Sequence, residues 1–211
     1  MKPLALTAAL LLSLTTSTFA ANLLVNGGFE DPITFDGPPF VGSWEGFSGG
    51  AGSSSGNSAV LPRTGTQSLG LSINNTVNTF AGAFQDVSGL APGMSFSLDG
   101  WHATTSSPLS LGVEIRIEWR NSVTDTEITR TPNSTPIPTA SYSAFNLSGF
   151  VPAGADTARV VYAIQSFSTA PLGNGTVYVD DVSFTAVPEP ATATLLGLGA
   201  LALIGARRRR I

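Results

Sequence analysis

Few side chains in this sequence have the types and spacing that covalent catalysis needs. His102 is the only histidine and there is no cysteine, so Cys–His and Ser–His mechanisms could use only that one imidazole. Glu114 and Glu118 could mimic the carboxylate pair of a glycosidase, but Arg116 lies between them in a stretch typical of a charged, solvent-facing strand. The residue content therefore indicates a protein that is not an enzyme.

The end of the chain has a different chemistry, that of membrane sorting. Two prolines so close together fit neither a helix interior nor a central strand, so they end the folded domain; this motif is Pro188, Glu189 and Pro190. The uncharged apolar run at residues 191–206 would make a helix of about 24 Å, a little shorter than a bilayer core of about 30 Å. Four arginines then form a cytoplasmic stop under the positive-inside rule: Arg207, Arg208, Arg209 and Arg210.

This order of Pro-Glu-Pro, Gly-rich apolar span and arginine cluster resembles the PEP-CTERM sorting signal of Gram-negative bacteria. The resemblance implies recognition at Pro-Glu-Pro by an exosortase-type membrane protease, removal of the tail, and release or transfer to the cell surface. Proteins with this signal often accompany exopolysaccharide and biofilm production. The alternative is an ordinary C-terminal membrane anchor, which does not require Pro-Glu-Pro at its head.

The N-terminus predicts export. Residues 1–20 have the positive start, the short apolar core and the small-residue cleavage site of a secretory signal peptide. Residues 21–186 then form one domain, and residues 187–211 form the sorting signal. Between residues 21 and 187, five arginines stand against thirteen carboxylates, a net charge of −8. An acidic domain without lysine is unsuited to nucleic acid and suits divalent cations and neutral partners.

The domain consists of short alternating runs separated by turn residues, without a sustained helical period. The clearest run is residues 111–120, in which apolar side chains from Leu111 to Trp119 face one way and charged side chains face solvent. The expected strands are residues 23–26, 67–73, 80–87, 95–103, 111–120, 126–131, 142–150, 158–164 and 177–184.

The connections between these runs are rich in Gly, Ser and Pro. Residues 49–58 contain no side chain large enough to pack, so we expect a mobile loop there. Residues 131–141 contain three prolines and form a second loop, and Leu90–Gly93 forms a tight turn. Many short antiparallel strands with such turns predict an all-β fold, a two-sheet antiparallel β-sandwich of the jelly-roll type.

Short motifs follow one another through the whole domain: Asn22–Glu30, Gly65–Leu69, Gln85–Val87, Phe96–Leu98, Val151–Ala155 and Val177–Phe184. In this order they resemble the carbohydrate-binding, galactose-binding-domain-like jelly rolls. The resemblance spans Asn22 to Phe184 and implies the fold more than it implies a particular ligand.

In that family the first and last strands lie together and commonly share a structural calcium ion. Carried over by position, the resemblance implies the carboxylates of Glu30 and Asp180 as ligands, with backbone carbonyls near Gly28 and Thr66. Calcium binds six to eight hard oxygens at about 2.3–2.6 Å, and a domain without disulfides gains stability from such an ion. The alternative is that these acids are a solvated turn residue and a strand-end charge.

Sugar binding in the family uses aromatic rings with polar groups beside them. Trp101 and Asp99 fall on the face opposite the apolar side chains of residues 95–103, so we expect them to contact the ligand. The alternative is that Trp101 only covers the second face of its sheet. Trp119 falls on the core face of its strand, and Trp44, at the entry to a strand, is expected to fill the core.

These features predict an exported, non-catalytic protein of the cell surface or extracellular matrix that binds or organises exopolysaccharide. A structural or adhesive matrix protein without a sugar pocket is the alternative, and a hydrolase is a third. A glycan array with and without calcium distinguishes the first two.

Overall fold

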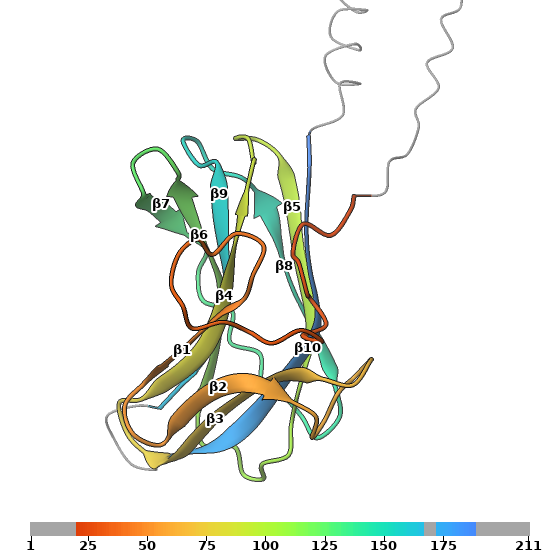
Figure 1. Cartoon of the computed structure of the whole chain (residues 1–211), viewed down its shortest axis with the longest axis vertical. Helices are drawn as coiled ribbons and strands as arrows, with labels where there is room; N and C mark the ends of the chain where they lie inside the picture. Colours follow the sequence, from red (N-terminus) through yellow and green to blue (C-terminus); the bar gives the residue numbers. More distant parts are fainter. Residues whose placement is uncertain (1–19, 167–171, 189–211) are drawn as a thin grey trace, which may run out of the picture.

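The computed structural model describes residues 20–166 and 172–188, which form two five-stranded sheets packed face to face (Figure 1). The regular elements within these ranges are all β-strands. The described residues contain no helix long and apolar enough to cross a membrane. The predicted all-β sandwich is therefore confirmed. The strands are β1 (Glu45–Gly49), β2 (Ser53–Ser58), β3 (Ser68–Thr76), β4 (Phe80–Ser88), β5 (Ser95–Thr104), β6 (Gly112–Asn121), β7 (Thr126–Arg130), β8 (Ser143–Phe150), β9 (Thr157–Gln165) and β10 (Gly173–Val187).

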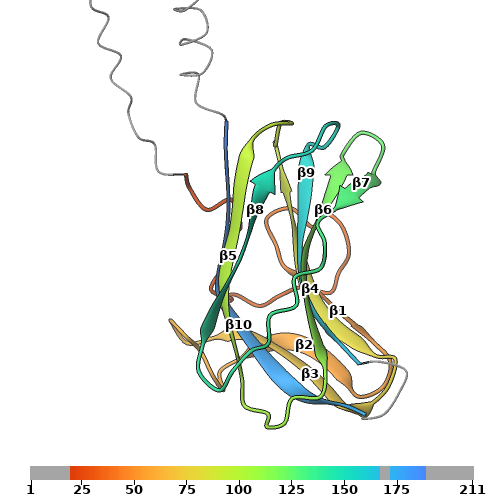
Figure 2. The ribbon, with the colours of Figure 1, turned by 180° about the vertical axis from the view of Figure 1, so that it is seen from behind.

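The two sheets interleave along the chain. Sheet A has the order β1-β4-β9-β6-β7, sheet B has the order β2-β3-β10-β5-β8, and neighbouring strands are antiparallel throughout. Consecutive strands β4, β5 and β6 therefore cross from one sheet to the other and back, as seen from both sides in Figures 1 and 2. This crossing gives each sheet one face in the shared core and one outer face.

The core is built from the inward-facing side chains of both sheets, as the alternation predicts. On β6, Val113, Ile115, Ile117 and Trp119 are buried, and the Trp119 ring lies 5.0 Å from that of Phe96 on β5. Trp44 is also buried, with its ring 5.0 Å from that of Phe29. The predictions that Trp119 and Trp44 are core residues are confirmed.

The prediction of a strand at residues 23–26 is wrong, because no strand is assigned there. The segment nevertheless lies beside the last strand, as the resemblance implied. The Leu23 N–H donates to the Phe184 carbonyl (2.8 Å) and the Val182 N–H donates to the Gly27 carbonyl (2.8 Å), so this segment lies along β10. Asn26 and Phe29 have φ angles of 55° and 54°, which interrupt an extended ladder. The segment therefore follows β10 by single contacts between turns.

The mobile loop predicted for residues 49–58 is also wrong. Its residues complete β1 and form all of β2, whose Ser54 and Gly56 pair with Ser72 and Gly70 of β3. Ladder hydrogen bonds come from the backbone, so small side chains do not prevent pairing when a neighbouring strand supplies the register. Strand β1 was not predicted at all.

Candidate functional site

The outer face of sheet A carries an aromatic stripe, the side chains of Phe47 on β1 and of Phe80 and Phe84 on β4. The Phe47 ring centroid lies 6.1 Å from that of Phe80 and 6.1 Å from that of Phe84. Phe80 is 46% exposed although it is a large apolar residue. Phe40, in the loop before β1, extends the stripe with a ring 4.8 Å from that of Phe84.

Glycines allow these rings to lie against the sheet. A Cβ atom added at Gly82 would lie 2.4 Å from Phe47 Cζ, and one added at Gly49 would lie 2.3 Å from Phe80 Cζ. The space that a side chain would occupy at each glycine is therefore taken by a neighbouring phenylalanine ring. Beyond Gly82, the next residue in the same cross-strand row is Ala163 on β9, and we call these two small, buried residues the floor of the outer face.

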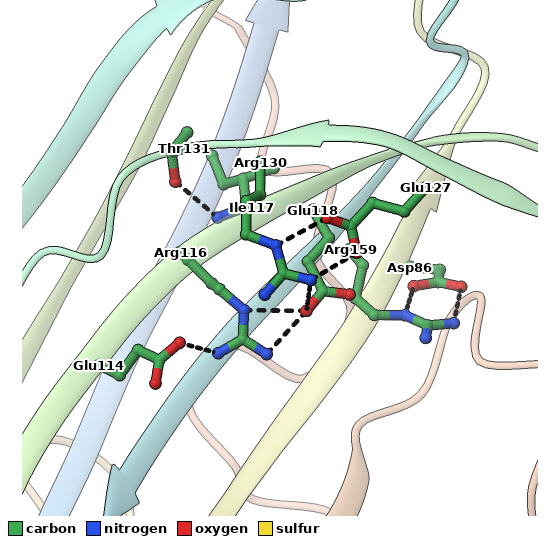
Figure 3. Close-up of polar contacts among 9 residues, drawn as sticks. All are labelled: Asp86, Glu114, Arg116, Ile117, Glu118, Glu127, Arg130, Thr131 and Arg159. Carbon is green, nitrogen blue, oxygen red and sulfur yellow. Dashed lines mark hydrogen bonds and ion pairs between the residues drawn. The ribbon is translucent and has the colours of Figure 1, made fainter.

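On the other side of that floor lies a charged ladder, which we define as Glu114, Arg116 and Glu118 on β6 and Glu127 and Arg130 on β7 (Figure 3). Arg116 donates from Nε (2.9 Å) and Nη2 (2.7 Å) to Glu118 Oε1, and from Nη1 to Glu114 Oε1. The side chain of Arg116 is 16% exposed and residue Glu118 is 8% exposed. The prediction that this charged row faces solvent freely is therefore corrected, because the side chains bury one another.

The ladder continues across β7. Arg130 donates from Nε and Nη2 to the two carboxylate oxygens of Glu127, each at 2.7 Å, and its Nη2 lies 4.0 Å from Glu118. Hydrogen bonding to Arg130 holds the pKa of Glu127 below its ordinary value. The guanidinium and carboxylate planes are thus fixed in place before any ligand arrives.

A second ion pair joins the ladder side to the aromatic stripe. Arg159 on β9 donates to both oxygens of Asp86 on β4, at 2.7 and 2.9 Å. Its guanidinium carbon lies 4.3 Å from the Phe84 ring centroid and 4.9 Å from that of Phe40. This pair also lines an open hollow of about 480 Å³ between the 38–41 loop and Arg120.

The predicted ligand residues Trp101 and Asp99 lie on the outer face of sheet B, as the alternation of β5 indicated. The Trp101 ring is covered there, because the guanidinium carbon of Arg63 lies 4.0 Å from its centroid and Arg63 pairs with Asp181 at 2.5 Å. Asp99 accepts hydrogen bonds from Ser97 Oγ (2.7 Å) and Asn146 Nδ2 (2.6 Å). Both side chains are thus engaged within the protein, and their role toward a ligand stays a prediction.

His102 lies in the core. It is 1% exposed, its Nδ1 lies 2.7 Å from the Tyr162 hydroxyl, and burial lowers its pKa to about 4. The only histidine of the chain therefore has no access to a surface ligand in this fold.

The predicted calcium residues meet around one loop, residues 63–67. Glu30 accepts hydrogen bonds from the Thr66 N–H and hydroxyl and from the Gln67 N–H. These donors hold the pKa of Glu30 below its ordinary value, led by the Thr66 hydroxyl. Asp180 is buried and its Oδ2 accepts from the Arg63 N–H (2.7 Å) and the Thr64 N–H (3.2 Å). The two acids therefore hold the loop through N–H donors.

The carboxylate oxygens of Glu30 and Asp180 are of the chemical type that calcium binds. Asp180 Oδ1 accepts only the N–H of Asp181 among the hydrogen bonds of the described residues, and Asp180 is fully buried. No three acidic or histidine side chains cluster within the described ranges, so backbone carbonyls would have to supply the remaining oxygens. When bound, calcium would supply positive charge that ties the first segment to β10. It stays a prediction here.

Of the sorting motif, the structure describes only Pro188, which is exposed directly after β10. Glu189 and Pro190, the apolar run, Arg207–Arg210 and the signal peptide up to residue 19 lie outside the described residues.

Sequence reasoning missed the aromatic stripe. Phe80 and Phe84 are four residues apart and so share a strand face, which was a usable signal. Their partner Phe47 was out of reach, because β1 was not predicted and its pairing with β4 was unknown.

Comparisons with known proteins agree with both parts of the chain. Residues 186–210 match the PEP-CTERM protein-sorting motif, which marks a secreted protein that is sorted to the surface. No curated protein matches the chain by sequence.

Solved structures with carbohydrate-binding modules share the jelly-roll fold of the domain. A family 16 carbohydrate-binding module is 20% identical with a TM-score of 0.51, and the match covers 78% of this chain and 99% of that chain. A xylan-binding domain from Paenibacillus barcinonensis is 18% identical with a TM-score of 0.51, over 74% and 99% of the two chains. The enzymatically active domain of a tailspike protein of bacteriophage CBA120 is 18% identical with a TM-score of 0.60, over 79% of this chain but only 21% of that chain.

Proposed function

We propose that the exported domain binds polysaccharide at the cell surface through the outer face of sheet A, without catalysis. The observation that carries this proposal is that the aromatic stripe and the charged ladder flank the same row of small residues, Gly82 and Ala163. Stripe and ladder lie on β4 and β6, two strand spacings apart, which is about 10 Å. A sugar ring that lay across this row would contact both groups.

The two sides of this floor offer complementary contacts. Aromatic rings such as Phe47 and Phe80 provide flat apolar area for the C–H face of a sugar at little cost in side-chain entropy. The planar guanidinium and carboxylate groups of Arg116 and Glu114 provide donors and acceptors for hydroxyl groups. Because these groups already hold one another, binding requires little reordering of side chains.

The same geometry speaks against hydrolysis. The guanidinium group of Arg116 lies between the carboxylates of Glu114 and Glu118 and donates hydrogen bonds to both. It therefore fills the space between the two acids in which a glycosidase holds the bond that it cleaves. We therefore infer a binding protein, with removal of the tail by an exosortase-type protease at the inner membrane of a Gram-negative bacterium and exopolysaccharide as its extracellular partner.

A structural or adhesive matrix role is the second candidate, and the outer face of sheet B favours it. That face has an open hollow of about 330 Å³ lined by small, uncharged residues and one aromatic residue, among them Ser54, Gly56, Gly70, Ser72 and Tyr178. A surface of this kind can pack against another chain without a sugar.

A glycan array followed by titration tests the first proposal. Phe80→Ala should weaken polysaccharide binding about tenfold while the melting temperature stays nearly unchanged, because a half-exposed ring contributes to the ligand more than to the core. Trp101→Ala is the matched variant on the outer face of sheet B, and it leaves the affinity unchanged if the outer face of sheet A alone binds the sugar. Loss of binding in Trp101→Ala with none in Phe80→Ala would reverse the assignment of the two faces. Absence of binding to any glycan, with calcium present, would favour the matrix role.

A further inference from the structure

The sorting motif begins where the last strand ends. In β10, Thr185, Ala186 and Val187 still pair with Ser97, Phe96 and Ser95 of β5, and Pro188 is the next residue. Pro188 also lies beside the Ala91–Met94 turn, around a small open hollow. No linker therefore separates the folded domain from the residues at which the tail is recognised.

A protease acts on chain that is locally open, and it contacts residues on both sides of the bond that it cuts. Here the residues before the motif are hydrogen-bonded to β5, and so they cannot enter an active site while the sheet stays paired. An extended chain covers at most about 3.6 Å per residue, so Pro188 alone cannot provide the missing reach.

The end of β10 is built to detach over a short length. Strand β3 pairs with β10 only from Gly173 to Val179, so Thr185–Val187 have a ladder partner on one side only. These three residues are partly exposed, and detaching them uncovers little apolar area.

Phe184 sets the limit of this detachment. It is fully buried, and its ring stacks on that of Phe96 at 5.9 Å. Its N–H donates to Asn22 Oδ1 (2.9 Å) and its carbonyl accepts from the Leu23 N–H (2.8 Å). Opening beyond this residue would break into the core, so the opening stops at Thr185.

From these contacts we propose that removal of the sorting tail requires Thr185–Val187 to leave sheet B, while Phe184 stays anchored. A membrane protease that binds its substrate as an extended peptide would bind the chain with this segment released. The inference rests on the proposed processing at Pro188–Pro190, and it makes the rate of processing depend on pairing between β10 and β5.

A reversible cross-link tests the inference in the full-length chain. Thr185→Cys with Ser97→Cys joins a directly opposed pair, and Thr185 lies before the matched motif at residues 186–210, which stays intact. The chain has no cysteine of its own, so the two new thiols can pair only with each other within one molecule. Ser54→Cys with Ser72→Cys, an opposed pair of β2 and β3, is the matched control.

Tail removal is followed by mass spectrometry in membranes that contain the protease, with and without reductant. The oxidised Thr185→Cys/Ser97→Cys chain should lose its tail at least tenfold more slowly than its reduced form, and the control pair should show no difference. A Gly-Ser-Gly-Ser insertion between position 185 and Ala186 leaves residues 186–210 intact and should restore the rate in the oxidised chain. Equal rates with and without the cross-link would overturn the inference and leave processing intact. A wild-type chain that keeps its arginines would overturn both.

Discussion

The two outer faces of the sandwich differ in what lies over their aromatic side chains. On sheet A the rings of Phe47 and Phe80 lie over glycines and turn outward. On sheet B the ring of Trp101 lies under Arg63, which belongs to a loop fastened by Asp180 and Asp181. An outward position on a strand therefore does not make a ring available, because a side chain from a neighbouring loop can cover it.

The arginines of the domain are divided unequally between the two faces. Four of the five arginines of the domain, Arg116, Arg120, Arg130 and Arg159, form ion pairs on or beside the outer face of sheet A, and Arg116 and Arg130 share Glu118. The fifth, Arg63, serves the loop on sheet B. Arg159 covers the Phe84 ring on sheet A as Arg63 covers the Trp101 ring on sheet B, whereas Phe80 at the end of the stripe stays 46% exposed.

The largest expected effect on this difference between the two faces comes from a variant that releases the loop of residues 63–67 on sheet B. Asp180→Ala leaves the N–H groups of Arg63, Thr64 and Asp181 without their buried acceptor. We expect a loss of about 3 kcal/mol in the free energy of unfolding, measured in urea, because each unpaired buried donor costs about 1–3 kcal/mol. Asp180→Asn keeps one oxygen and should lose less.

Glycan affinity at sheet A should be unchanged in both Asp180 variants at a temperature where they are folded. An equal loss of stability in Asp180→Asn and Asp180→Ala would show that charge, and not hydrogen bonding, holds the loop.

Calcium provides a second test of the loop on sheet B, because its predicted ligands also hold that loop in place. Adding calcium should raise the melting temperature, with a stabilisation of about 2.7 kcal/mol at a hundredfold excess over the dissociation constant, and EDTA should reverse it. Glu30→Gln should abolish most of the response. Asp31→Asn, at the neighbouring exposed acid, should keep it. Identical melting in calcium and in EDTA would leave the N–H contacts as the whole function of these acids.

His102, in the core between the two faces, has a smaller and pH-dependent effect on the free energy of unfolding. The pKa of His102 is about 4 in the folded protein and about 6.5 in the unfolded chain, so below pH 6.5 the unfolded chain binds a proton that the folded protein does not. Stability should therefore fall by about 2 kcal/mol from this group between pH 6.5 and 5. In His102→Gln, which keeps a polar partner for Tyr162, the fall should be smaller by that amount in urea titrations. Parallel pH curves for the two proteins would contradict a buried neutral imidazole.

Alternation along the strands was enough to predict the fold class and most of the strands. The run at residues 111–120 places its core and outer faces correctly, because burial follows the two-residue period directly. Strand β2 escaped prediction because residues 49–58 are nearly all Ser and Gly. The pairing of β1 with β4 and of β2 with β3 depends on register rather than on side chains.

The candidate site was harder to predict than the fold. The cover on Trp101 comes from Arg63, which is distant in sequence and lies in a loop without a periodic pattern. The floor between stripe and ladder exists because β9 separates β4 from β6, an order of strands that no local pattern contains. Contacts that depend on strand order are therefore beyond sequence reading, while the faces of single strands are within it.

The end of β10 also has a mechanical side. The strand leaves the sandwich along its own direction, at one end of the molecule (Figure 1). Tension applied at Pro188 along that direction loads the hydrogen bonds to β5 in shear, so that they share the load. A sideways force at the same point unzips them one pair at a time, from Val187 toward the anchor at Phe184. The end of β10 therefore resists a force along the strand and opens under a sideways force, so the direction of the force decides whether it detaches.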